Sequence, residues 1–358
     1  MDTGSGVAAA IADHMANGEG FDHHLLLSRD PTCQIGDRLD RLAASVTELP
    51  AGRLAEVRCV RATCEALSPE IVHAHSSFAG AYARVALPRR WQARIVYTPH
   101  CYAFERLDVG RGVRAAFWLA EAALSFRGGQ VAACSPLEAS RARSLPGSQR
   151  VTYVPNVGRA PDSPWESAPP DVVRVAAAGR ITAQKAPGLF AEAAHLSRRS
   201  PQRMQWVWVG GGDPALEATL RSAGVEVTGW LDRDRALRAL AGSSLYVHTA
   251  TWEGAPMTIL EAAAAGVPVL ARRTAAMEAL EVQPLFETAT DLLELIREFP
   301  AGPAITVAHR CGERLRGRHS SLAQQQALAT LYGQVPIGVT GPSRPPPPLP
   351  PGGPSGGA

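Results

Sequence analysis

The chain has 358 residues and a formal net charge of +3, which leaves room for two domains, each with its own core. So small a charge excludes a protein whose main partner is nucleic acid, because such a protein needs a strongly basic face. Six cysteines without metal-binding or disulfide spacing indicate free thiols in a reducing compartment. The sequence contains no apolar run of membrane-span length and no apolar leader, so we expect a cytoplasmic protein.

Apolar runs alternate with helical patterns along the whole chain, which predicts an α/β protein with parallel sheets covered by helices on both faces. In the first half the expected strands cover 22–27, 71–75, 95–98, 131–134 and 151–154, and the expected helices cover 53–66, 113–125 and 136–144. In the second half the expected strands cover 172–178, 205–209, 225–228, 245–249 and 267–271, and the expected helices cover 186–200, 214–223, 234–241 and 256–265.

The composition divides the chain into five stretches. We expect a first Rossmann-like domain at 1–157, a linker at 158–171, a second Rossmann-like domain at 172–310, and a helical segment at 311–335 that returns toward the first domain. The stretch 340–358 is almost entirely Pro, Gly and Ser and cannot bury a core, so we expect it to be disordered.

The stretch 252–270 carries the strongest functional signal. Glu253 and Glu261 stand eight positions apart around an expected helix start, with Pro256 suited to the first helical position and Gly266 to the end. The free amides of that first turn favour an anion such as a phosphate, and a carboxylate on either side can accept hydrogen bonds from hydroxyls. A ligand with both phosphate and hydroxyl groups is expected here, and a nucleotide sugar has both.

Lys185 is the single lysine among 36 basic residues, a bias typical of a GC-rich genome. A lysine kept in such a sequence indicates a site that needs a compact ammonium rather than a planar guanidinium. It ends the turn that begins at Gly179 and Arg180, directly after an expected strand, so two cations form a clamp for phosphate. The alternative is codon drift with one accidental lysine; the segment around Glu253 favours the functional interpretation.

These motifs resemble those of the bacterial retaining glycosyltransferases of family 4, whose GT-B fold has two Rossmann-like domains facing each other across a cleft. The family's paired glutamates are matched by Glu253-Gly254 and Leu260-Glu261-Ala262, and its Gly-Arg and Gln-Lys by Gly179-Arg180 and Gln184-Lys185. Weaker similarities follow in the family's order from about Gly4 to Tyr332: His73 to Ser77, Tyr97 to His100, Val154 to Asn156, Gly210 to Gly212, Thr228 to Trp230 and Tyr246 to Ala250.

The resemblance implies a role for each matched residue of the second domain. Arg180 and Lys185 would hold the donor diphosphate, and Glu261 would accept hydrogen bonds from the ribose hydroxyls. Glu253 would orient a hydroxyl of the transferred sugar. The residues whose backbone amides would support sugar and phosphate are Gly254, Ala255, Met257 and Thr258.

The resemblance also places two residues of the first domain at the donor. His100, which follows an expected strand, would reach across the cleft toward the sugar, with Glu253 as the second catalytic residue. Gly6 belongs to a glycine loop, Gly4-Ser5-Gly6, that would let the backbone approach the diphosphate.

The implied reaction is the transfer of a hexosyl group, with retention of anomeric configuration, from a UDP- or GDP-linked donor in carbohydrate biosynthesis. The acceptor hydroxyl would belong to a small molecule, a lipid-linked sugar or a glycan. No cofactor and no metal are expected, because two cations and a helix terminus neutralise the leaving group. Asp232 and Asp234 are expected to begin a helix rather than bind a metal. An arginine cluster between residues 84 and 114 leaves open a peripheral contact with the inner face of a membrane.

Several features depart from the family. The glycine loop follows Met1 by three residues, so the first strand of the fold is missing, through a late start or degradation, and the N-terminal sheet would lose a central strand. Cys101 stands where the family has Gly. A non-catalytic binding relic, or a GT-B epimerase or phosphorylase, is therefore an alternative function. His73 and His75 share one strand face, for which a structural role is preferred to a metal pair.

Overall fold

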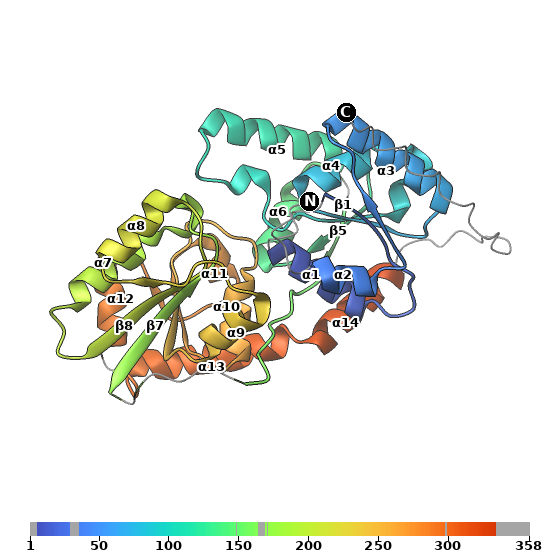
Figure 1. The fold of residues 1–358 in the computed structure, drawn as a ribbon. Helices are drawn as coiled ribbons and strands as arrows, with labels where there is room; N and C mark the ends of the chain where they lie inside the picture. Colours follow the sequence, from blue (N-terminus) through green and yellow to red (C-terminus); the bar gives the residue numbers. More distant parts are fainter. Residues whose placement is uncertain are drawn as a thin grey trace, which may run out of the picture.

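The computed structural model describes residues 6–28, 36–147, 149–163, 169, 171–297 and 299–333. The strands in these ranges form three parallel sheets, and the chain builds two α/β units that lie side by side (Figure 1). The expectation of parallel α/β layers is confirmed. The expected tail at 340–358, together with Gly4 and Ser5 of the glycine loop, lies outside the described residues.

In the described residues, the N-terminal unit has six strands and six α-helices. Its strands are β1 (His24–Leu27), β2 (Ser45–Glu48), β3 (Val72–His75), β4 (Ile95–Thr98), β5 (Gln130–Ala133) and β6 (Arg150–Tyr153). Its helices are α1 (Gly6–Asn17), α2 (Gly36–Leu42), α3 (Arg53–Leu67), α4 (Ser77–Ala86), α5 (Arg111–Ser125) and α6 (Pro136–Ser144), with 3₁₀ turns η1 (Arg89–Arg94) and η2 (Ala103–Glu105).

The strands of the N-terminal unit form two separate sheets. Among the described residues, β1 pairs with β2, in register from His24 opposite Ser45, whereas β3, β4, β5 and β6 form a four-stranded sheet in that order.

The C-terminal unit holds one six-stranded parallel sheet in the order β12-β11-β10-β7-β8-β9. Its strands are β7 (Val172–Ala178), β8 (Arg203–Val209), β9 (Glu226–Val227), β10 (Leu245–His248), β11 (Val269–Arg272) and β12 (Leu285–Phe286). Its helices are η3 (Ala183–Lys185), α7 (Pro187–Ser197), α8 (Pro214–Ser222), α9 (Arg233–Ala241), α10 (Met257–Ala264), α11 (Ala275–Ala279), α12 (Ala289–Ile296) and α13 (Pro303–Arg318).

The central strand β7 shows why this sheet forms. Successive side chains of a strand point to opposite faces, and both faces of β7 are covered. Val173, Val175 and Ala177 belong to the core that packs under α7 and α12, while Ala176 and Ala178 belong to the core under α10. A run of small and β-branched residues fits such a doubly buried strand, so the sequence predicts its bounds correctly.

The last helix, α14 (Ser321–Gly333), lies against the N-terminal unit (Figure 1). Leu328, Leu331 and Tyr332 pack with Val96 of β4 and Ala132 of β5. The chain therefore runs from the C-terminal unit along α13 and back to the N-terminal unit through α14. No helix in the described ranges has both the length and the apolar character needed to span a membrane.

Candidate functional site

The loops after β7 and β10 meet at the carboxyl edge of the C-terminal sheet, where open α/β sheets bind ligands. Gln184 donates through Nε2 to the carbonyl of Trp252 at 2.9 Å, and its own carbonyl accepts the Thr251 amide at 2.8 Å. The Thr249 hydroxyl donates to the carbonyl of Lys185 at 2.5 Å. These bonds hold the turn that carries Lys185 against the turn that carries Glu253.

Lys185 and Glu253 form an ion pair across these two turns, with Nζ and Oε1 2.5 Å apart. Their side chains are 19% and 14% exposed, so both remain within reach of a ligand while losing most of their solvent screening. Arg180, in the same turn as Lys185, is exposed. The structure thus brings together the lysine and the first glutamate that the sequence selects.

Two glycines make this close approach of loops feasible. Gly179 has φ 125° and Gly210, after β8, has φ 138°, both in the region that favours glycine. A Cβ atom on Gly210 would lie 2.4 Å from the carbonyl oxygen of Gly179, and one on Gly179 would lie 3.1 Å from Cε of Lys185. Any side chain at either position would therefore displace the turn that holds the lysine.

Helix α10 follows Glu253 and begins at Met257, with Pro256 as its N-cap. The expectation that Pro256 occupies the first helical position is thus wrong by one residue. Thr258 lies in the first turn, where its Oγ1 accepts a hydrogen bond from the hydroxyl of Tyr246 at 2.7 Å. Since helix starts leave amides without intrahelical partners, this turn can bind an anion.

Glu261 lies on the buried face of α10, with its side chain 2% exposed. Burial raises its pKa, and the Arg233 guanidinium of α9, which pairs with it, opposes that shift. Sequence reasoning missed Arg233, because the two residues meet only through the packing of α9 on α10. Asp232 caps α9 by accepting the amide of Arg235 at 2.8 Å, which confirms its predicted helix-starting role.

Residues of the N-terminal unit contact the first turn of α10 directly. A Cβ atom on Gly254 would lie 2.9 Å from the backbone nitrogen of Cys101, and one on Gly6 would lie 3.2 Å from Cγ of Met257. Asn156 donates through Nδ2 to the carbonyl of Ala255 at 3.2 Å. Six of the residues predicted for the site, from both units, are thus arranged around the start of α10: Gly6, His100, Glu253, Gly254, Ala255 and Met257.

His100 follows β4. Both His100 and its neighbour Cys101 have positive φ angles, of 53° and 81°. Glu138 fixes this strained corner, because its carboxylate accepts the Cys101 amide at 2.7 Å. Burial, together with the neighbouring His14, lowers the pKa of His100 to about 3. The imidazole of His100 is therefore neutral near pH 7, and its Nε2 lies 3.0 Å from Nδ1 of His75.

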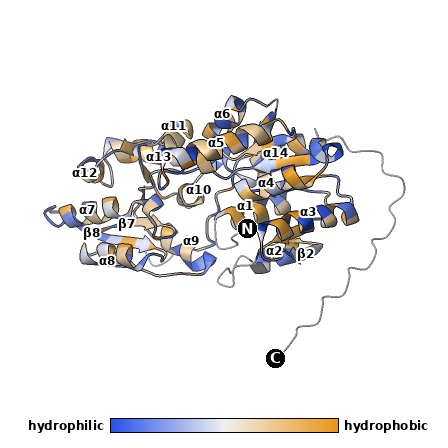
Figure 2. Ribbon diagram, turned by 90° about the horizontal axis from the view of Figure 1, so that it is seen from above, coloured by the Kyte–Doolittle hydropathy of each residue, from blue (hydrophilic) through white to orange (hydrophobic). Residues whose placement is uncertain are grey.

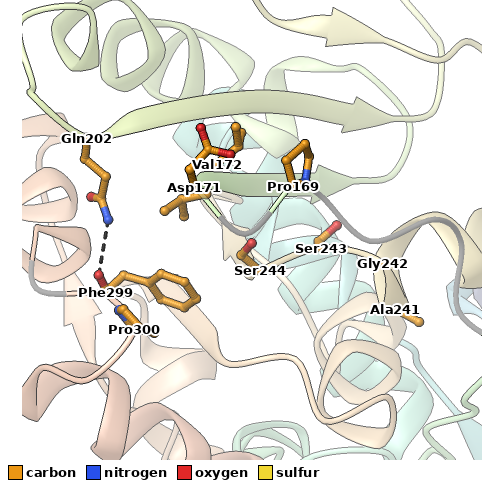
Figure 3. A pocket seen from close by; sticks show the side chains of 11 residues that line it. Pro169, Asp171, Val172, Gln202, Ala241, Gly242, Ser243, Ser244, Phe299 and Pro300 are labelled. Carbon is orange, nitrogen blue, oxygen red and sulfur yellow. Dashed lines mark hydrogen bonds between the residues drawn. The ribbon is translucent and has the colours of Figure 1, made fainter.

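A cavity elsewhere in the C-terminal unit, of about 340 Å³, is not this site (Figure 3). It lies beside Val172 and Val173, where β7 begins, and is lined on other sides by Gln202, Ser244 and Phe299. It is therefore at the opposite edge of the sheet from Lys185 and Glu253. None of the residues predicted for the site lines it.

Comparison with known protein families matches both units. Residues 4–157 match the family described as "Glycosyl transferase 4-like domain", and residues 173–297 match "Glycosyl transferases group 1". The fold and the two matches together define a glycosyltransferase with the GT-B fold. The chain belongs to these enzymes, with a 4-like domain followed by a group 1 domain. A search of curated proteins by sequence found no match.

Solved structures with similar folds support the same architecture. The structure of Anabaena HepE in complex with UDP and glucose matches with a TM-score of 0.70 and 17% identity, over 92% of this chain and 96% of that one. Sucrose-phosphate synthase from Thermosynechococcus elongatus matches with a TM-score of 0.72 and 18% identity, over 92% of each chain. The lipopolysaccharide outer core galactosyltransferase WaaB matches with a TM-score of 0.63 and 15% identity, over 92% and 99%.

His248 directly precedes Thr249, and its buried side chain predicts how the stability of the fold depends on pH. Burial lowers the pKa of His248 well below its ordinary value, and the nearby Lys185 adds to the effect. The unfolded chain binds a proton at this imidazole below about pH 6.5, whereas the folded chain does not. The free energy of unfolding therefore keeps its full value above that pH and falls below it. In His248→Gln we expect the loss of stability on acidification to be shallower by about 1.4 kcal/mol per pH unit.

Urea unfolding between about pH 7 and about pH 5 measures this slope. The matched control is His309→Gln on α13, because His309 is exposed and should leave the slope unchanged. Equal slopes for the two variants would contradict the assignment of a buried neutral imidazole at position 248.

Proposed function

We propose that this chain is a retaining glycosyltransferase that moves a sugar from a UDP- or GDP-linked donor to a hydroxyl acceptor. The observation that carries the proposal is the Lys185–Glu253 pair, held beside the first turn of α10 and faced by the His100 corner of the other unit. Anabaena HepE, a similar fold, is described with UDP and glucose, which supports a UDP-linked donor.

The donor diphosphate binds between the two loops of the C-terminal unit. Arg180, Lys185 and the backbone amides between Gly254 and Thr258, before and within the first turn of α10, face its oxygens. Gly6 lets the N-terminal backbone approach from the other side. Phosphate oxygens compete with Glu253 for the Lys185 ammonium. Once it is free of the lysine, the Glu253 carboxylate accepts a hydrogen bond from a hydroxyl of the transferred sugar.

Glu261 receives the ribose hydroxyls in this proposal. Because its carboxylate is buried against Arg233, the nucleoside has to displace the guanidinium or share the carboxylate with it. Arg233 is 34% exposed and lies near the start of α9, so it can turn outward without disturbing the core. Donor binding thus exchanges one partner of Glu261 for another.

The chemical step breaks the bond between the anomeric carbon and the β-phosphate oxygen and forms a bond from that carbon to the acceptor oxygen. In a front-side attack both bonds lie on one face of the sugar, which retains the configuration, and the acceptor proton passes to the departing phosphate. Two side-chain cations and the helix terminus stabilise the negative charge on the leaving group, so we propose that no divalent metal is needed there. His100, neutral and next to Gly254, contacts the sugar from the N-terminal unit.

We further propose that the acceptor is presented at a membrane surface, as a lipid-linked sugar. Eight of the eleven exposed large apolar side chains in the described part of the chain lie between residues 54 and 126. They belong mainly to α3, α4 and α5, which lie together along one side of the N-terminal unit (Figure 1). Trp118, Leu119 and Phe126 are 41%, 62% and 70% exposed, and Arg111 begins the same helix. An apolar helix face with basic residues beside it is typical of interfacial binding to anionic lipid.

The catalytic assignment predicts that Lys185→Ala and Glu253→Gln each lower the transfer rate at least roughly tenfold, a loss of about 1.4 kcal/mol of transition-state stabilisation. Release of UDP or GDP from a panel of nucleotide sugars measures the rate. Arg203→Ala and Glu278→Gln are the matched controls, because they remove exposed ion-paired charges away from the site and should leave the rate unchanged. Near-normal rates in both site variants would overturn the assignment.

The membrane assignment predicts that Leu119→Ser weakens sedimentation with vesicles containing anionic lipid. The matched control is Leu322→Ser on α14, because both leucines are 62% exposed and only the first lies on the proposed surface. We expect at least about a threefold loss for the first variant, since burying much of one leucine contributes on the order of 1 kcal/mol, and no change for the second. Equal binding by the two variants, or no binding by the unaltered chain, would contradict the proposal.

A further inference from the structure

Three histidines from two elements, α1 and β3, meet inside the N-terminal unit. His73 and His75 are two residues apart on β3 and share one face, with ring centroids 4.1 Å apart. His14 projects from α1 onto the same pair, with its ring centroid 5.4 Å from that of His73 and 5.2 Å from that of His75. One ligand atom from each of the three rings lies within 4.8 Å of the other two.

The ring of His14 is the unusual member of this cluster. His14 is 3% exposed, and neither Nδ1 nor Nε2 of its ring has a hydrogen-bond partner in the described part of the chain. Leaving a buried polar group without a partner costs about 1–3 kcal/mol, so a folded protein seldom tolerates it without a reason. A bound group that accepts an imidazole nitrogen as a ligand would supply the missing interaction.

The other two rings are held in place by hydrogen bonds to neighbouring side chains. Nδ1 of His73 lies 2.9 Å from the hydroxyl of Tyr332 and Nε2 lies 2.8 Å from Oγ1 of Thr98. Nδ1 of His75 contacts Nε2 of His100 at 3.0 Å. If one nitrogen of His73 exchanges its hydroxyl partner for a metal, the other keeps a hydroxyl, which fixes the ring and its tautomer.

The position of α1 is itself fixed beside the cluster. Asp13, the residue before His14, is fully buried, and its Oδ1 accepts hydrogen bonds from Arg38 and from Arg159, each at 2.8 Å. Helix α1 is apolar over most of its length (Figure 2) and packs into the core of the N-terminal unit. The histidine is therefore presented by a rigid element, as a preformed ligand site requires.

We propose that His14, His73 and His75 form a binding site for a divalent transition-metal ion, for which Zn²⁺ is the probe. Three imidazole nitrogens without a carboxylate or thiolate suit Zn²⁺, Cu²⁺, Ni²⁺ or Fe²⁺, whereas Mg²⁺ prefers oxygen ligands. Tetrahedral Zn²⁺ at about 2.0–2.1 Å from each nitrogen would place the nitrogens about 3.4 Å apart, so binding draws the rings closer together. The fourth position is left for water.

The cluster adjoins the proposed donor site through the contact between His75 and His100, but the proposed transfer routes no step through it. Its test therefore needs no transferase activity. The full chain, stripped with a chelator, is titrated with Zn²⁺ by calorimetry, and with Co²⁺ by the visible absorption that four-coordinate Co²⁺ gives with nitrogen ligands. We expect saturation at one equivalent of either ion per chain.

The variant that tests the ligand set is His14→Leu, which keeps an apolar helix residue of similar size. It should weaken Zn²⁺ binding by more than about 100-fold, the upper end for loss of an outer-shell partner. His24→Leu is the control, because His24 is exposed and its ring hydrogen-bonds to Ser45, outside the cluster, so affinity should be unchanged. A second ligand variant, His73→Asn, should weaken binding similarly, and a melting curve without metal checks that each variant is folded.

Two results would overturn the proposal. One is the absence of saturable Zn²⁺ uptake by the unaltered chain, which would leave the cluster as a stack of neutral rings. The other is one-equivalent binding that persists with unchanged affinity in folded His14→Leu, which would place the ion elsewhere.

Discussion

The ion pair between Lys185 and Glu253 is the interaction on which the site depends. It joins the turn after β7 to the turn after β10, two neighbouring strands whose carboxyl ends open toward the other unit. The side chains of Gln184 and Thr249 also join the two turns by hydrogen bonds to backbone carbonyls. The ammonium and the carboxylate are therefore in position before any ligand binds. A preorganised cation of this kind stabilises charge on a leaving group without reorganising during the reaction.

The second constraint is contact between the two units. Gly254 leaves room for the backbone of Cys101 only because it has no side chain, and Asn156 holds the carbonyl of Ala255 from the segment that joins the units. Helix α14 returns to the N-terminal unit and packs Tyr332 against it. The His100 corner and the first turn of α10 are thus held face to face by packing at several points, which is the arrangement that a GT-B enzyme needs for a donor between its domains.

How far the sequence predicts this structure depends on how local each feature is. Strands such as β7 and the helix start after Pro256 follow from short patterns, and Lys185 stands out because it is the single lysine. The short strands β2 and β12 and the helices α1, α4 and α12 were not predicted, because tertiary packing rather than a local sequence pattern determines them. Arg233 and His14 escaped notice for the same reason: nothing near them in the sequence indicates that one meets Glu261 and the other meets His73. A site defined by the spacing of residues along the chain can be predicted from the sequence, whereas a site defined by tertiary contacts cannot.

The most direct test of the central claim is the melting temperature of the chain with UDP, GDP or ADP, measured alongside Lys185→Ala. A ligand at a hundredfold excess over its dissociation constant adds about 2.7 kcal/mol to stability, which raises the melting temperature by several degrees. We expect such a rise with UDP or GDP, and no rise or a much smaller one in the variant. No rise with any nucleotide, or an equal rise in the variant, would contradict a donor site built on Lys185 and Glu253.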